Sequence, residues 1–142
     1  MRGQVSLDLL FAVAIIAITM LSVMNVALSE RTETEVTGTA AQLKAFAIDL
    51  RGTVARLYTS PGMTVVKESP VKLGPGDSIN VTLTEDGYIR IKAQISGREY
   101  VLVQKLQVPP GTTSSVVLTQ AAPEFKVSSR RSPDGVQVIL ET

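Results

Sequence analysis

The sequence predicts an α+β fold, with a long N-terminal helix over about residues 4–58 and an antiparallel β-sheet or β-sandwich head in residues 59–142. Two observations predict it. The chain opens with an almost unbroken apolar run that continues into a segment of helical period. From about residue 59 the pattern changes to the alternation of half-buried β-strands, with turn residues between short segments.

Composition limits what the protein can do. The chain has 142 residues, with 14 Lys and Arg against 13 Asp and Glu, so no strong field points to a nucleic acid partner. It contains no Cys, His or Trp, which excludes disulfides, thiolate or imidazole metal sites, and catalysis by Cys or His. We therefore expect a protein that is not an enzyme and has no cofactor, no metal and no catalytic residue.

The first element is the apolar run. From Leu9 to Ser29 no residue carries a formal charge, and about 20 helical residues cross the roughly 30 Å of hydrocarbon in a bilayer. Arg2 precedes the run, and acidic residues predominate among the charges that follow it from Glu30 to Glu35, so basic charge favours a cytoplasmic N-terminus. A cleaved secretory signal would have a shorter apolar region and a small-x-small site. The sequence thus predicts a single membrane pass with the remainder outside.

A motif stands directly before this run. Gly3, Gln4, Ser6 and Asp8 spell G-Q-x-S-x-D. On its own, Asp8 would be an acid at the membrane interface, in the first helical turn, where the helix dipole favours negative charge. With its neighbours the pattern resembles the precursor of an archaeal type IV pilin, which has a class III signal peptide: a short basic leader ending in Gly, then Gln, then Ser, then an acid at the fifth mature position.

The resemblance implies a leader of residues 1–3 and cleavage between Gly3 and Gln4 by a prepilin peptidase, with Gln4, Ser6 and Asp8 serving leader recognition and assembly. Cleavage would create an ammonium group at Gln4. In a filament core of low dielectric constant that charge needs a partner, and Asp8 would supply it. The pair would form either within one helix or between subunits.

The resemblance also implies the wider function. The chain would be a major or minor pilin of a surface filament, first inserted in the cell membrane and then extracellular. Its partners would be further copies in a helical filament or other pilins, the prepilin peptidase, and a pilus assembly membrane protein with its ATPase. The alternative is an uncleaved, single-span anchor for a β-sandwich that acts as a surface protein or as an accessory of secretion or of the archaellum.

Residues 30–58 are predicted to extend the helix as an amphipathic segment, after residues 4–29 in the membrane or filament core. Gly38 and the Thr residues before it weaken the helix, so a bend or loosened turn is expected there. The apolar stripe is expected to pack on the chain's own β-domain, with a short coiled coil as the alternative. It consists of Val36, Ala40, Leu43, Ala47, Leu50, Val54 and Leu57.

The head begins after the turn at residues 60–62. Alternating residues predict a β-hairpin in residues 78–97, with Glu85–Asp86–Gly87 at its turn. Short segments bounded by Pro and Gly predict further strands, and the whole indicates an antiparallel sheet, or a sandwich. Those further strands are MTVVK, REYVLVQKLQV, SVVLTQ, EFKVSS and GVQVILE.

Polar residues in the head suggest little chemistry. Asp77, Glu85 and Asp86 fit no calcium loop and are interpreted as solvated turn residues. Residues 74–76, Gly-Pro-Gly, form a turn rather than a phosphate loop, since no helix and Lys follow. Asn80 begins an Asn-Val-Thr triplet on the polar face of its strand and is a candidate for N-glycosylation if the head is exported.

Overall fold

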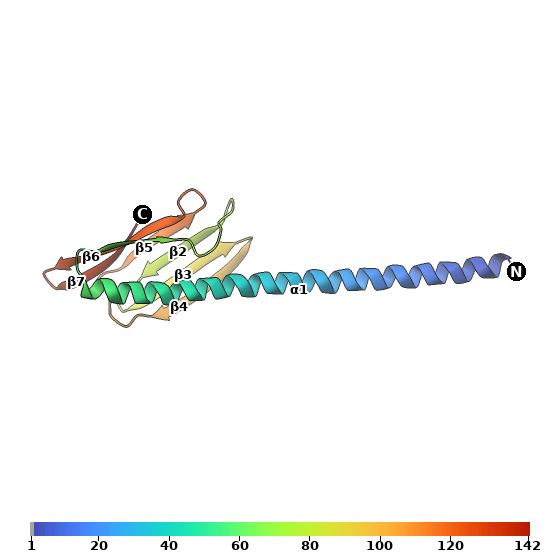
Figure 1. The fold of residues 1–142 in the computed structure, drawn as a ribbon, viewed down its shortest axis with the longest axis horizontal. Helices are drawn as coiled ribbons and strands as arrows, with labels where there is room; N and C mark the ends of the chain where they lie inside the picture. Colours follow the sequence, from blue (N-terminus) through green and yellow to red (C-terminus); the bar gives the residue numbers. More distant parts are fainter. Residues whose placement is uncertain (1) are drawn as a thin grey trace. The chain divides into compact units, whose positions relative to one another are not determined.

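The computed structural model describes the backbone of residues 2–142 and the side chains of residues 6–31 and 35–142. It confirms the α+β fold, with one long helix followed by a three-stranded and a four-stranded antiparallel sheet (Figure 1). The chain divides into two compact units, Met1–Gly38 and Thr39–Thr142. The elements are α1 (Arg2–Thr59), β1 (Thr64–Glu68), β2 (Ser78–Leu83), β3 (Tyr88–Ile95), β4 (Arg98–Lys105), β5 (Ser114–Thr119), β6 (Glu124–Ser132) and β7 (Gly135–Glu141).

The strands pair in two orders. One sheet has the order β4-β3-β2-β5 and the other the order β1-β6-β7. The hairpin predicted in residues 78–97 is confirmed as β2 and β3, with Val81 opposite Ile91. The five further segments are strands as well. The short first strand pairs with β6, far along the chain, so that Val65 lies opposite Val127.

A two-residue turn sets the position of β4. Ser96 and Gly97 join β3 to β4 and both have positive φ, 52° and 75°, which is the backbone of a type I′ turn and matches the twist of the strands. Ile95, just before the turn, pairs with Arg98, just after it. The turn therefore fixes the register of the β3–β4 hairpin.

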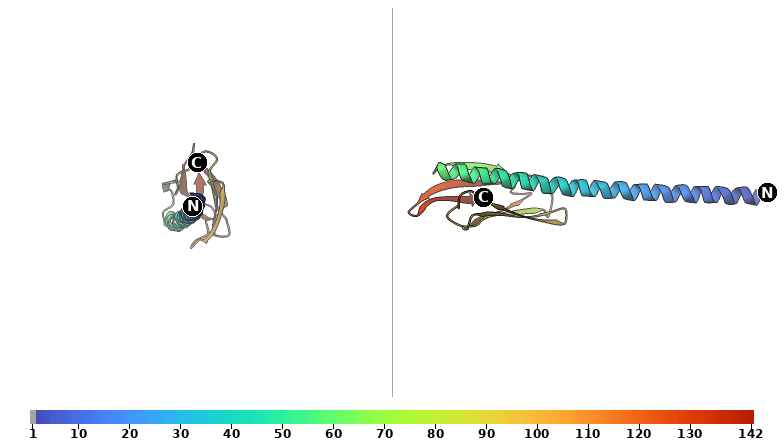
Figure 2. Two further views of the ribbon diagram at one scale, coloured as in Figure 1. Left: turned by 90° about the vertical axis from the view of Figure 1, so that its right-hand side faces the viewer. Right: turned by 90° about the horizontal axis from the view of Figure 1, so that it is seen from below.

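The sheets approach one another at β5 and β7. The amide of Val138 in β7 donates to the carbonyl of Pro110 at 2.9 Å, and the amide of Leu140 donates to the Ser114 hydroxyl at 3.0 Å. In the second unit, buried side chains of the sheets and of helical residues 39–59 form a common core. The end-on view of Figure 2 shows the helix lying beside the strands. The head is therefore a β-sandwich whose core includes part of the helix.

The helix contributes one face to this core. Leu43, Ala47, Leu50, Val54 and Leu57 are at most 2% exposed, which confirms that the predicted stripe packs on the chain's own β-domain. The stripe is shorter than predicted, because Ala40 is exposed and Val36 is only half-buried.

Two further residues join this face of α1. Phe46 meets Phe125 of β6 edge to face, with ring centroids 6.0 Å apart, and the buried Thr53 hydroxyl donates to the carbonyl of Asp49 at 3.0 Å. The backbone described from Arg2 to Thr59 is helical without a break, so the loosened turn expected at Gly38 is not seen in it.

Candidate functional site

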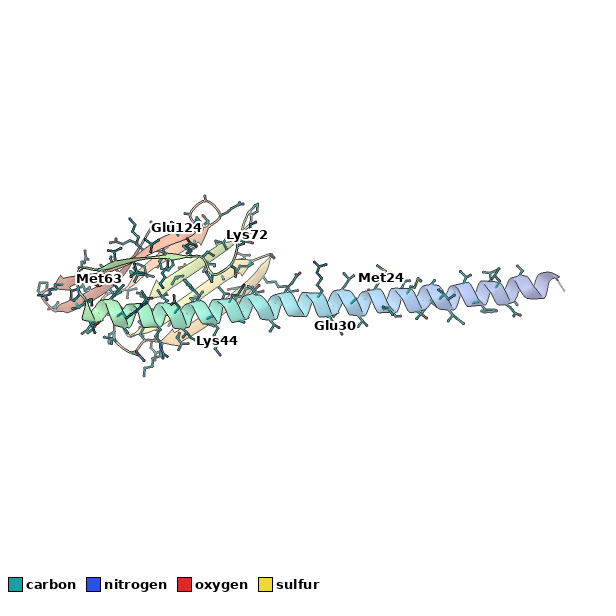
Figure 3. All side chains as sticks on the ribbon, in the orientation of Figure 1. Met24, Glu30, Lys44, Met63, Lys72 and Glu124 are labelled. Carbon is teal, nitrogen blue, oxygen red and sulfur yellow. The ribbon has the colours of Figure 1, made fainter. Side chains whose placement is uncertain are left out.

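In the apolar segment of α1, residues 6–29, the large side chains are exposed on every side of the helix. They project around the helix in Figure 3, where Met24 is labelled, and are 55% to 65% exposed. They are Leu7, Leu9, Leu10, Phe11, Val13, Ile15, Ile16, Ile18, Met20, Leu21, Val23, Met24, Val26 and Leu28.

A helix that is apolar on every side needs an apolar environment on every side. The helical backbone satisfies its own hydrogen bonds, which is the condition for lying in hydrocarbon. α1 is long and apolar enough to cross a membrane by length and composition, and is thus compatible with a membrane anchor. A lipid bilayer or the helices of other chains would supply the missing cover.

The six polar side chains of this segment differ in whether the helix itself satisfies them. The hydroxyl of Thr19 donates to the Ile15 carbonyl at 2.8 Å, and that of Ser22 donates to the Ile18 carbonyl at 2.9 Å. Each hydroxyl is satisfied within its own helix and needs no outside partner.

The hydroxyls of Ser6 and Ser29 have no hydrogen bond to any group that the structure describes. Asp8 and Asn25 are the acid and the amide of the segment. Neither side chain has a hydrogen bond or an ion pair with any other side chain or backbone group that the structure describes. Both are exposed. Their separation of 17 residues corresponds to about 25 Å along a helix, so these two polar groups lie at opposite ends of the apolar segment.

Asn25 was not singled out in the sequence. Its signal was nevertheless present, since it is the one side-chain amide in residues 6–29. An amide in hydrocarbon costs free energy unless it is hydrogen-bonded, which is the reason that Asn in a membrane helix points to a neighbouring helix.

The motif residues lie at the start of α1. Ser6 and Asp8 are helical and exposed, and the backbone of Gly3 and Gln4 is helical too. The side chain of Gln4 is outside the described residues. Positions 4 and 8 are one turn apart on a helix and share a face. The helical backbone therefore places the predicted cleavage point and Asp8 on one side of the helix, and cleavage itself stays a prediction.

Asp77 in the head has a structural role that the sequence analysis missed. One carboxylate oxygen, Oδ2, accepts from the Gly74 amide at 2.9 Å, and Oδ1 accepts from the Ser96 amide at 2.9 Å. These bonds lower the pKa of the Asp77 carboxyl below its ordinary value. Asp77 thus ties the turn before β2 to the turn after β3, instead of being only a solvated turn residue.

The other polar candidates in the head lie apart. Glu85 and Asp86 are exposed in the turn between β2 and β3. In the part of the chain that the structure describes, no three Asp or Glu side chains gather as metal ligands would. Asn80 is exposed on β2, and the Thr82 hydroxyl donates to its side-chain carbonyl at 3.4 Å. Glycosylation of Asn80 stays a prediction.

Comparison with protein-family models, with curated proteins and with solved structures finds no match to this chain.

Proposed function

We propose that this chain is a structural subunit, a major or minor pilin, of an archaeal type IV pilus-like surface filament, cut by a prepilin peptidase between Gly3 and Gln4. The N-terminal helix would lie in the cell membrane with its N-terminus in the cytoplasm, and would then move into the filament core, leaving the head outside. The G-Q-x-S-x-D motif directs the proposal to this family.

The observation that carries the proposal is the contrast among polar groups on the apolar helix. Thr19 and Ser22 are satisfied internally, whereas Asp8 and Asn25 have no partner among the described groups. The hydrocarbon of a bilayer covers apolar side chains but offers no partner to an acid or an amide that enters it, so a bilayer alone would leave both groups to seek the interfaces. Packing of several copies of the helix would cover both kinds of group.

Cleavage would complete the site at Asp8. It creates an ammonium group at Gln4, one helical turn from the Asp8 carboxylate, and a buried charge that loses its partner costs about 3–5 kcal/mol. Asn25 would form a second contact further along the helix, because an Asn side chain between packed helices hydrogen-bonds to a neighbouring helix. Two polar contacts at separate levels would set the axial register of neighbouring helices.

The first test is the mass of the N-terminal peptide of protein recovered from native membranes or shed filaments. The proposal requires it to begin at Gln4. A peptide that begins at Met1 would instead identify an uncleaved membrane-anchored surface or accessory protein. One that begins near Glu30 would mean that the helix was a disposable secretory signal.

The second test is the variant Asp8→Ala. We expect it to be cleaved and membrane-inserted but to form filaments with a yield reduced about 100-fold, the factor for roughly 3 kcal/mol of an unpaired charge. Asp8→Glu keeps the charge and should assemble. Glu85→Ala removes an exposed acid of the head and should also assemble. Normal filaments from Asp8→Ala would refute the assigned role of Asp8.

A further inference from the structure

The four-stranded sheet ends at β4 (Arg98–Lys105), where no further strand covers its edge (Figure 1). β4 is eight residues long and contains no Pro or Gly. The outer face of the sheet carries Val101, 68% exposed, and Val103, 55% exposed, on this strand. A long edge strand with exposed β-branched side chains is a template for pairing with another strand.

Other sheet edges in the head are shorter or occupied. β7 is tied to the loop before β5 by the Val138–Pro110 hydrogen bond and to the start of β5 by the Leu140–Ser114 hydrogen bond. β1 has only five residues, and Lys67 in it donates to the Asp49 carboxylate of α1 at 2.7 Å. The edge of β4 has no such cover among the described residues.

The backbone of β4 offers free groups on that edge. The amide of Leu106, just beyond β4, donates to the Gly87 carbonyl at 2.8 Å, toward β3. Because bonding direction alternates along an antiparallel strand, residues 100, 102 and 104 also bond to β3, while residues 99, 101, 103 and 105 direct their N–H and C=O groups outward. The side chains of these outward-bonding residues are all exposed.

We propose that β4 is a homotypic docking edge, which pairs antiparallel with β4 of a second copy of this chain in a register centred on Leu102. In this register Val101 lies opposite Val103 of the second copy, and Glu99 lies opposite its Lys105. Each pair occurs twice, because the contact is two-fold symmetric. The two four-stranded sheets would become one continuous sheet.

Charge and hydrogen bonding select this register over its neighbours. A shift by one residue places outward-bonding groups against residues that bond to β3, so the ladder is lost. A shift by two residues keeps the hydrogen-bond ladder but separates Glu99 from Lys105. In one direction it sets Glu99 opposite Val103, and in the other it sets Glu99 beyond the end of the partner strand. Among these registers, only the proposed one pairs Glu99 with Lys105 and Val101 with Val103, so that every outward-bonding residue of β4 meets a favourable partner.

The Glu99 carboxylate already has one contact within its own sheet. Lys92 of β3 approaches Glu99 Oε1 at 3.3 Å, with both side chains more than half exposed. The contact holds Glu99 on the outer face and leaves its second oxygen for Lys105 of the second copy. The resulting charge contact is exposed and therefore serves register more than affinity.

The symmetry of the contact determines the relative orientation of the two copies. A two-fold axis that relates antiparallel strands of one sheet is perpendicular to that sheet, so it reverses every direction within the plane. Residues 39–59 of α1 lie lengthwise along the sheets (Figures 1 and 2). These helical parts of the two copies would run in opposite directions, so the contact joins copies that approach from opposing sides.

Disulfide trapping tests the proposal on the full chain in detergent micelles, because the protein has no cysteine of its own. Val101→Cys and Val103→Cys chains are prepared separately, carry different mass tags, and are oxidised alone and after mixing. Directly opposite residues of a hydrogen-bonded pair have Cα atoms about 5.5 Å apart, within disulfide range. Residues offset by two are about 7–8 Å apart, beyond that range.

We expect mixed chains to form disulfide-linked dimers at several times the level of either variant alone. Val117→Cys, an exposed valine on the outer face of β5 that is 48% exposed, provides the background. Dimers no more abundant than this background, or equally abundant in the mixed and the single samples, would overturn the proposal. The result does not depend on cleavage at Gly3, so it succeeds or fails separately from the proposed filament function.

A charge exchange gives a second test of the register, read by the same cysteine trapping. Glu99→Lys alone and Lys105→Glu alone each set like charges opposite one another and should reduce head pairing. The double variant Glu99→Lys with Lys105→Glu should restore it, as measured by trapping through the added Val101→Cys and Val103→Cys pair. Failure of the double variant to recover, in chains that remain folded by circular dichroism, would contradict the register.

Discussion

At the scale of the residue, Asp77 is the clearest case of a single side chain that fixes local structure. Its two carboxylate oxygens accept from two backbone amides that lie on either side of the β2–β3 hairpin, at Gly74 and Ser96. Ser96 itself has a left-handed backbone, φ 52°, which a non-glycine residue adopts at some cost. The hydrogen bond that the Ser96 amide donates to Asp77 helps to hold it there.

The variant Asp77→Asn tests this role. Its amide oxygen accepts as before, but its NH₂ group cannot accept, so one backbone amide loses its partner. The hydrogen bonds lower the pKa of the Asp77 carboxyl in the folded state, so its contribution is present above the unfolded value of about 3.9 and is lost as pH falls through the folded value.

We therefore expect Asp77→Asn to lower the thermal midpoint of unfolding at pH 7, and the difference from the parent chain to shrink as the pH falls through the acid range. Circular dichroism melts of the two proteins between pH 7 and pH 2 provide the measurement. Glu85→Gln, in the neighbouring exposed turn, is the matched control and should leave the midpoint unchanged. A pH-independent difference would assign the effect of Asp77→Asn to something other than its charge.

Single residues were the least predictable part of this protein. Asp77 could be placed in a turn from the sequence, but Ser96 lies 19 positions away, and no local pattern links the two. The 4-3 spacing of Leu43, Ala47 and Leu50 does not include Phe46. It is buried because β6 brings Phe125 to the adjacent position, a contact between distant parts of the chain.

At the scale of the element, residues 39–59 of α1 have two faces that differ in what they touch. Leu50 is completely buried beneath the sheets, whereas Ile48 is 50% exposed and Lys44 points away from the sheets in Figure 3. Burial of one face accounts for the stability of this helical segment, because most helical stability in proteins comes from the packing of an amphipathic face.

We expect Leu50→Ala to destabilise the head by about 2–5 kcal/mol, because it removes buried methyl groups and leaves a cavity. Ile48→Ala removes a comparable aliphatic side chain from the exposed face and should cost less than about 1 kcal/mol. Denaturant unfolding of the full chain in detergent, followed by the loss of the β-sheet signal, measures both. Equal losses would show that the face containing Leu50 is not the buried one.

Elements were much more predictable than their pairing. Each strand alternates apolar and polar residues or is bounded by Pro and Gly, so all seven could be recognised locally. The β2–β3 partnership also followed, because a short turn joins the two segments. The β1–β6 partnership did not, since nothing in the sequence near Thr64–Glu68 indicates a partner at Glu124–Ser128.

At the scale of the whole molecule, the two compact units are stabilised differently. Thr39–Thr142 encloses its own core, in which the buried side chains of α1 meet those of both sheets. Residues 6–29 enclose nothing, and their large apolar side chains remain exposed. Asp8 and the apolar run could therefore be recognised in the sequence, whereas Asn25 was missed, and neither side chain has a partner among the groups that the structure describes.

We expect residues 39–142 to fold as a soluble monomer or weak dimer, with a cooperative unfolding transition. A fragment of residues 61–142 should not fold, because it lacks six core side chains of the helix, from Leu43 to Leu57. Circular dichroism and dispersion of amide resonances distinguish the two fragments. A folded 61–142 fragment would mean that the sheets form a sufficient core without α1.

The pairing of β1 with β6 has a consequence for how the chain folds while it is being synthesised. β1 and the buried face of α1 emerge from the ribosome early, but their contacts in β6 emerge only after β2, β3, β4 and β5. Until residues near Phe125 have been synthesised, the helix lacks its aromatic contact and β1 has no neighbouring strand. Completion of the head therefore waits for the synthesis of β6, and nascent chains stopped before β6 present apolar surface that chaperones and proteases recognise.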